Sequence, residues 1–303
     1  MAINFKKLLL GLVIFTFYFS ALGLLTTLKA NPSCSDYTNA DGAVTYTDNT
    51  SGVFSACLIT PQSMTIDLHF IGLCKEQPTI ANFRTVCSSL FTSTTGETKT
   101  ISTTTSANLM NDVTLDEGTY THAAILIKNA LSYSAKIKFS PARTGKTGTG
   151  EWCWSLDGNT GTVNTAVGSQ ATWIAECGAA APSSFGSNSS SPNAIFSVAS
   201  GNRYDNFETG TTASTSWTVY LLKADETLNT GTAGNYASFG TAKYFLGIQQ
   251  FNTAVSITPR TSNLDVGFRL EDTFRVETVE NAGTHYIPQF GMGGFEFKVL
   301  TSE

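Results

Sequence analysis

Short stretches in which apolar and polar residues alternate recur along this chain, and they constrain its fold more than any other feature. In residues 64–70 every second residue is apolar, from Met64 to Phe70, which predicts a strand with one buried face. A continuous apolar run at 123–127 predicts a central strand covered on both faces. Further alternating stretches lie at 133–139, 217–221, 255–257 and 295–299.

Helical spacing is confined to one segment. Apolar residues recur three and four apart in residues 80–91, after Pro78, and this predicts a short helix. Turn-forming residues separate the strand-like stretches, and the abundant threonines favour strands through their branched Cβ. The pattern predicts an all-β fold, an antiparallel β-sandwich with little helix; a partly closed barrel is the alternative.

Residues 1–30 have the layout of a secretory signal peptide. Lys6 and Lys7 precede an apolar run at 8–25, and a polar stretch ends at Ala30. Two interpretations stay open, because Leu28 occupies a position where cleavage favours a small residue and the run can span a thin bilayer if it is not cut. Both predict export to the periplasm, the cell surface or the medium, with membrane contact only through an uncleaved segment.

Cysteine usage agrees with export. The chain has six cysteines, and an even number in an exported protein indicates disulfides. Sequence proximity favours the pairs Cys34–Cys57, Cys74–Cys87 and Cys153–Cys177, each of which would contribute roughly 3 kcal/mol by closing a short loop. The spacing of these cysteines does not fit a metal site, and we expect no bound metal and no cofactor.

The mature chain is interpreted as one β-sandwich domain over residues 31–303. A Gly/Ser/Thr-rich excursion at about 141–200, closed by a disulfide, is expected to be inserted into it. The composition of residues 178–194 indicates a flexible loop or linker. Two packed sandwiches are the alternative organisation.

One segment resembles a known family. Residues 115–121, with Gly118 and Tyr120 ahead of the apolar run, resemble the "acidic-Gly-x-Tyr then strand" signature of transthyretin-like (prealbumin-like) modules in secreted bacterial surface proteins. Gly118 would permit a tight turn, and Tyr120 could pack its ring while its hydroxyl stays solvated. The resemblance implies a prealbumin-like or immunoglobulin-like antiparallel β-sandwich and a structural or ligand-presenting role.

Three of the four tryptophans lie in the expected excursion. Trp152 and Trp154 would share one face of a strand, while Cys153 takes the other and Trp173 follows downstream. If the face formed by Trp152, Trp154 and Trp173 is exposed, it can bind sugar rings or a partner protein. If it is covered, these residues form the core of the excursion.

Residues that could perform catalysis do not form a recognisable motif. The histidines His69, His122 and His285 lie on separate segments, and adjacent acids on a strand point to opposite faces. The turn-like run at 157–161 lacks the later Glu of a calcium loop. Asn49 and Asn188 begin formal glycosylation sequons.

Charge excludes one further class of function. The net charge is −5, with 18 basic and 23 acidic residues, which argues against a nucleic-acid-binding protein. The sequence therefore predicts a non-enzymatic, exported envelope or surface protein with a structural, adhesion or assembly role. Its expected partners are other surface proteins or copies of itself; a carbohydrate-binding module or a secreted glycan hydrolase are the alternatives.

Overall fold

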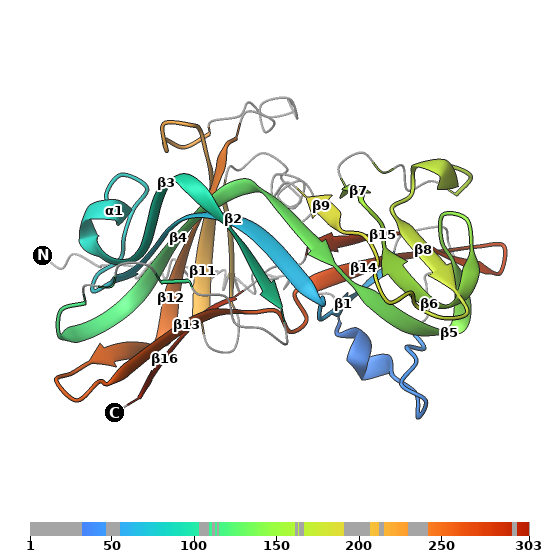
Figure 1. Cartoon of the computed structure of the whole chain (residues 1–303), viewed down its shortest axis with the longest axis horizontal. Helices are drawn as coiled ribbons and strands as arrows, with labels where there is room; N and C mark the ends of the chain where they lie inside the picture. Colours follow the sequence, from blue (N-terminus) through green and yellow to red (C-terminus); the bar gives the residue numbers. More distant parts are fainter. Residues whose placement is uncertain are drawn as a thin grey trace, which may run out of the picture. The chain divides into compact units, whose positions relative to one another are not determined.

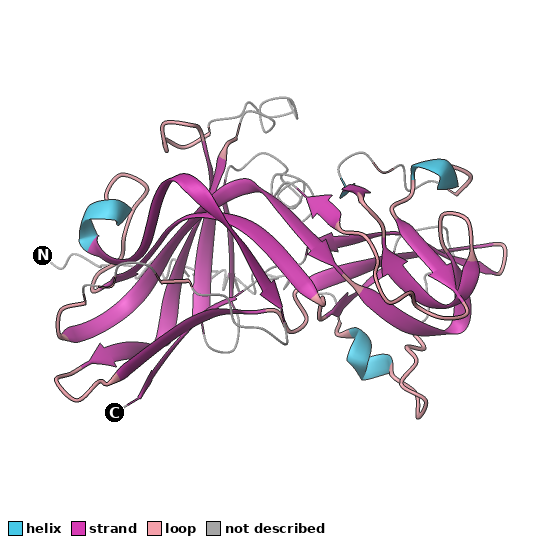
Figure 2. Ribbon diagram, viewed as in Figure 1, coloured by secondary structure: helices cyan, strands magenta, loops and turns pink. Residues whose placement is uncertain are grey.

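The structure is a computed structural model of the whole chain, and strands dominate it (Figures 1 and 2). The predicted leader, residues 1–30, forms a unit of its own and lies outside the described residues. The residues described are 32–46, 55–102, 109–110, 113, 115–160, 163, 167–190, 207–211, 215–229, 242–292 and 296–302.

The larger sheet has eight strands. Six of them follow the order β10-β11-β12-β4-β2-β3, and two short strands, β7 and β9, pair beside β4. Their bounds are β2 Ser63–Cys74, β3 Cys87–Ser102, β4 Gly118–Ser134, β7 Gly158–Asn159, β9 Asn188–Ser190, β10 Phe207–Thr211, β11 Thr215–Leu222 and β12 Tyr244–Ile257.

A second sheet has six strands in the order β1-β14-β15-β5-β6-β8, and β13 pairs with β16 in a third. Each large sheet is open, with a different strand at either end of its order, as in a sandwich rather than a closed barrel. The bounds are β1 Ser55–Ile59, β5 Lys136–Thr144, β6 Thr149–Ser155, β8 Ala175–Gly178, β13 Asn263–Arg269, β14 Phe274–Asn281, β15 Thr284–Met292 and β16 Glu296–Ser302.

Strand β4 is the central strand that the apolar run predicted. It pairs with β12 on one side and β2 on the other. Ala123, Ile125 and Ile127 join the main buried cluster, whereas Ala124 and Leu126 join a second cluster on the opposite face. Both faces are therefore covered. The alternating stretches at 217–221 and 255–257 also lie in strands, as do residues 296–299 of another; Phe295 lies outside the described residues.

Strand β2 departs from the strict alternation that its sequence suggests. Its register against both neighbours shifts between Leu68 and Phe70, which marks a β-bulge. Met64 and Leu68 belong to the main cluster, but Phe70 belongs to the second. The prediction that Phe70 shares a face with Met64 is wrong, because the extra residue reverses the side-chain direction beyond it.

The stretch 133–139 is divided between two sheets. β4 ends at Ser134 and β5 begins at Lys136, so the chain changes sheet at Ala135. Alternation continues through the crossing, since Tyr133, Ala135 and Phe139 are all buried. Tyr133 also donates a hydrogen bond from its hydroxyl to the Phe290 carbonyl in β15 at 2.7 Å, which ties the two sheets together.

Helix is scarce in the described part of the chain. The helix expected over 80–91 is a single turn, α1 Phe83–Val86, and Cys87 already begins β3. Two short 3-10 helices are η1 Cys34–Tyr37 and η3 Gln170–Thr172.

The predicted excursion supplies strands β6 and β8 to the six-stranded sheet. Within the expected linker, residues 188–190 form strand β9. Its last residues, 191–194, lie outside the described part.

All three disulfides form as sequence proximity predicted. Cys34–Cys57 joins η1 to β1, and Cys74–Cys87 joins two residues that are directly opposite on β2 and β3. Cys153–Cys177 joins opposite residues on β6 and β8. Disulfides of this kind persist in an oxidising compartment, so they indicate an exported protein.

Candidate functional site

The predicted tryptophan surface lies on strands β5, β6 and β8. Register aligns Lys136, Trp154 and Glu176 in one row across these strands, and it aligns Lys138, Trp152 and Gly178 in the next. Residues directly opposite one another on adjacent strands share a face. We call these six residues the Trp face. Both indoles are half-buried, and the cystine formed by Cys153 is buried on the other face.

The Trp154 indole rests on a glycine. A Cβ added to Gly178 would lie 3.2 Å from Cη2 and 3.6 Å from Cζ3 of Trp154. The six-membered end of the ring therefore lies against the Gly178 main chain, diagonally across the sheet. A larger residue at 178 would push the ring away, so the glycine sets the position of the indole.

The tip of the β5–β6 hairpin folds onto β8 and bounds the Trp face. A Cβ on Gly150 would collide with the carbonyl carbon of Gly178, and one on Gly145 would lie 2.6 Å from the Glu176 Cα. Lys146 also donates its main-chain N–H to the Ala175 carbonyl at 2.9 Å. This close approach of two main chains requires glycine at the tip.

The Glu176 carboxylate is held by that tip. It accepts hydrogen bonds from the Thr147 hydroxyl at 2.6 Å, from the Gly148 N–H at 2.7 Å and from the Cys177 N–H at 3.0 Å. Burial alone would raise the pKa of Glu176, but these hydrogen bonds together outweigh it and leave the pKa below its usual range. The group is an ionised structural anchor rather than a proton donor.

The two lysines of the Trp face have different neighbours. Lys136 places its ammonium 5.7 Å from the centre of the Phe185 ring, in a cation–π contact. Lys138 lies 3.6 Å from the Glu151 carboxylate, and the two side chains are 26% and 54% exposed. An ion pair this open to solvent contributes little stability. A ligand carboxylate can therefore replace Glu151 as the partner of Lys138.

Trp173 takes no part in this surface. Its side chain is fully buried, and its ring meets Tyr286 edge-on with the ring centres 5.7 Å apart. This corrects the expectation that Trp173 joins Trp152 and Trp154 in a platform. Trp173 is core: it lies between η3 and β8, outside the strand that carries Trp152 and Trp154, and it packs against Tyr286 of β15.

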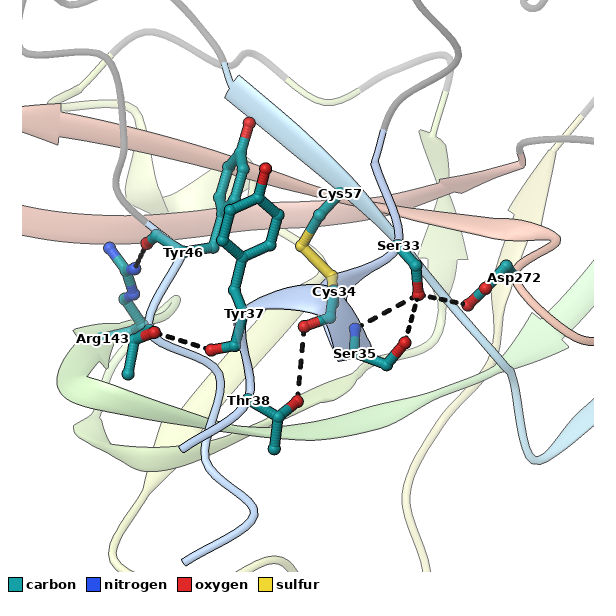
Figure 3. The surroundings of a disulfide bond; sticks show 10 residues. Ser33, Cys34, Ser35, Tyr37, Thr38, Tyr46, Cys57, Arg143 and Asp272 are labelled. Atoms are coloured by element: carbon teal, nitrogen blue, oxygen red, sulfur yellow. Dashed lines mark hydrogen bonds between the residues drawn. A yellow bond between two sulfur atoms is a disulfide. The ribbon is translucent and has the colours of Figure 1, made fainter. Parts of the chain in front are cut away.

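A second aromatic surface was missed by the sequence analysis. Residues 33–46 form a loop, here called the Tyr loop, in which the rings of Tyr37 and Tyr46 lie 5.0 Å apart, centre to centre (Figure 3). Tyr37 is 39% exposed, one of three large hydrophobic residues this open to solvent in the described part of the chain. Nothing in the local pattern marks these two tyrosines, which lie nine positions apart.

Distant residues hold the Tyr loop in place. The Cys34–Cys57 disulfide fixes its beginning, and Ser33 donates a hydrogen bond to Asp272 at 2.9 Å (Figure 3). Arg143, fully buried, donates to the carbonyl of Tyr46 at 2.7 Å. These contacts fix the loop that carries Tyr37 and Tyr46.

The remaining candidates have structural surroundings. His69 is buried and packs edge-on against Tyr244, with ring centres 4.9 Å apart. The Tyr120 hydroxyl donates to the Asp116 carbonyl at 2.8 Å, instead of remaining solvated as expected. The run at 157–161 was expected to form a hairpin turn, but Gly158 and Asn159 instead form strand β7, which pairs in parallel with β9; Gly161 lies outside the described residues.

The adjacent acids also point to separate partners. Asp225 accepts hydrogen bonds from Thr227, while its neighbour Glu226 forms an ion pair with Arg84. Within the residues that the structure describes, no group of three His, Cys, Asp or Glu side chains could hold a metal ion. In the same residues, no helix has the length and apolarity needed to cross a membrane.

Asn188, the start of one glycosylation sequon, is fully buried. The other, Asn49, lies outside the described residues. Comparison with known proteins adds no identity to these surfaces: no family model, curated protein or solved structure matches the chain.

Proposed function

We propose that this chain is a non-enzymatic, exported protein of a bacterial envelope or cell surface, with a structural, adhesion or assembly role. The observation that carries the proposal is the use of three disulfides to brace an almost entirely β-stranded scaffold. Such bracing suits a protein that works in an oxidising compartment. The apolar leader at residues 8–25 supports the same destination.

Contact with partner proteins would use the Tyr loop. Tyrosine supplies a large contact area at a small cost in side-chain entropy. Its ring packs against apolar groups, and its hydroxyl forms hydrogen bonds with polar ones. The loop is already fixed by Cys34–Cys57, Asp272 and Arg143, so binding need not order it. Other surface proteins or further copies of this chain are the proposed partners.

Cell fractionation combined with mass spectrometry of the mature N-terminus tests this proposal. We expect the protein in the envelope or medium, with six oxidised cysteines and an N-terminus near residue 31. An N-terminus at Met1 would mean that the leader anchors the protein. Recovery from the cytoplasm with reduced cysteines would refute the proposal.

The Trp face supports a second candidate function, carbohydrate binding. Trp154 rests on Gly178, and Trp152 shares its face in the next row. Sugar rings stack on flat apolar surfaces of this kind. A glycan array probed with the wild-type protein and Trp152→Ala tests it, and the absence of any Trp-dependent binding would exclude it.

A further inference from the structure

We propose that the Trp face binds acidic polysaccharides, in which sugar units carry carboxylates. The inference rests on the second candidate function above and names its ligand class. It depends on the juxtaposition of two lysines with two half-buried indoles on one face of β5 and β6.

The two indoles provide consecutive stacking positions. Trp152 and Trp154 are two residues apart on β6, so their Cα atoms are separated by about 6.6 Å along the strand. The contact of Trp154 with Gly178 fixes one ring, and the covalent bridge of Cys153 to Cys177 between them holds the strand pair. A linear sugar chain that follows β6 can therefore meet both rings without reordering the strand.

The lysines lie beside these positions and determine the charge preference. Lys136 is directly opposite Trp154, and Lys138 is directly opposite Trp152. Each stacking position thus has one lysine on the neighbouring strand. Carboxylates on successive sugar units would meet these cations, which attract anions from solution and fix the register of the bound chain.

The neighbouring carboxylates do not cancel this preference. The Glu176 carboxylate accepts hydrogen bonds from Thr147, Gly148 and Cys177, so both of its oxygens are already engaged by the hairpin tip and by its own strand. Glu151 forms the solvent-exposed pair with Lys138. A polymer carboxylate can replace it at little cost, because exposed ion pairs are weak and screened by salt.

Binding of one polymer in two charge states tests the proposal. Polygalacturonate and its fully methyl-esterified form share their sugar backbone, but only the first carries carboxylates. We expect the intact, oxidised protein to bind polygalacturonate at least tenfold more tightly, with a change in tryptophan fluorescence and weaker binding at higher salt. The Lys136→Gln/Lys138→Gln double variant should lose this tenfold preference, whereas Lys298→Gln on β16, an exposed control, should keep it.

The outcomes separate this inference from the function it rests on. Equal, Trp152-dependent binding of both polymers would overturn the acidic preference and leave carbohydrate binding in place. Binding of neither polymer by the wild-type protein would overturn the proposal outright, and an array without any Trp-dependent ligand would remove carbohydrate binding with it. Trp152→Leu, which keeps apolar volume without an aromatic ring, serves as a second variant, and a thermal melt checks that each variant is folded.

Discussion

Asn188 offers the sharpest test of how this scaffold is held together. Its side chain is fully buried at the start of β9 and bonds to three separate segments. The amide nitrogen donates to the carbonyls of Leu156 at 2.6 Å and Ile174 at 2.9 Å, and the amide oxygen accepts from the Phe290 N–H at 3.1 Å. One side chain thus connects the segments before β7 and β8 to β15.

Replacing Asn188 with Asp keeps the shape of the side chain but removes both donors. The carbonyls of Leu156 and Ile174 would then face a carboxylate instead of an N–H. A buried polar group left without its partner costs about 1–3 kcal/mol, so the two together cost about 2–6 kcal/mol. This is a large fraction of the stability of a typical domain, which is about 5–15 kcal/mol.

Urea unfolding with the disulfides intact measures the loss. We expect the free energy of unfolding of Asn188→Asp to fall by about 2–6 kcal/mol at pH 7. Its deficit relative to the wild-type protein at the same pH should shrink at acid pH, because protonation of Asp restores one donor. Ser189→Asp is the matched control, since residue 189 is exposed on the same strand. It should change stability by less than about 0.5 kcal/mol. Equal stability of the two variants would refute the reasoning about Asn188.

The remaining predictions concern packing, pH and the disulfides. Gly150→Ala should lower the free energy of unfolding by about 1–3 kcal/mol, because the added Cβ overlaps the β8 main chain. Gly267→Ala, which has open space at its Cβ, should leave it unchanged. Calorimetry compares the Tm values of the two variants. Burial lowers the pKa of His122 below 6.5, so the unfolded chain binds the proton more readily. Stability should therefore be full above pH 6.5 and fall as the pH drops below it, and His122→Gln should weaken this dependence in urea titrations at pH 7 and 5. Replacing Cys34 and Cys57 together with Ser should cost roughly 3 kcal/mol and increase aggregation, measured by light scattering; an unchanged urea midpoint would contradict this.

Sequence reasoning succeeded where structure depends on near neighbours. The disulfide partners lie 13 to 24 residues apart in the chain, and short loops close most readily. The run at 123–127 became the central strand because both of its faces are apolar. A continuous apolar run of strand length carries that information.

Sequence reasoning failed where a local irregularity or a contact between distant residues determines the structure. The bulge before Phe70 adds one residue without changing the composition, so the pattern could not show that Phe70 turns to the opposite face. Alternation also runs unbroken through Ala135, although the chain changes sheet there. The Tyr loop depends on Asp272, 239 residues away from Ser33, and no local signal reports such a contact.

The positions of two disulfides explain how the six-stranded sheet avoids open edges. At one end, Leu58 of β1 donates its N–H to the Pro32 carbonyl, and the Cys34–Cys57 bond holds this covering segment in place. At the other end, the hairpin tip covers β8 through Lys146, next to the bridge between β6 and β8. Exposed strand edges pair with other chains and aggregate. A protein exported away from cytosolic chaperones gains from strand edges that covalent bonds keep covered. In this sheet the same bonds that brace the strands therefore also limit unwanted pairing.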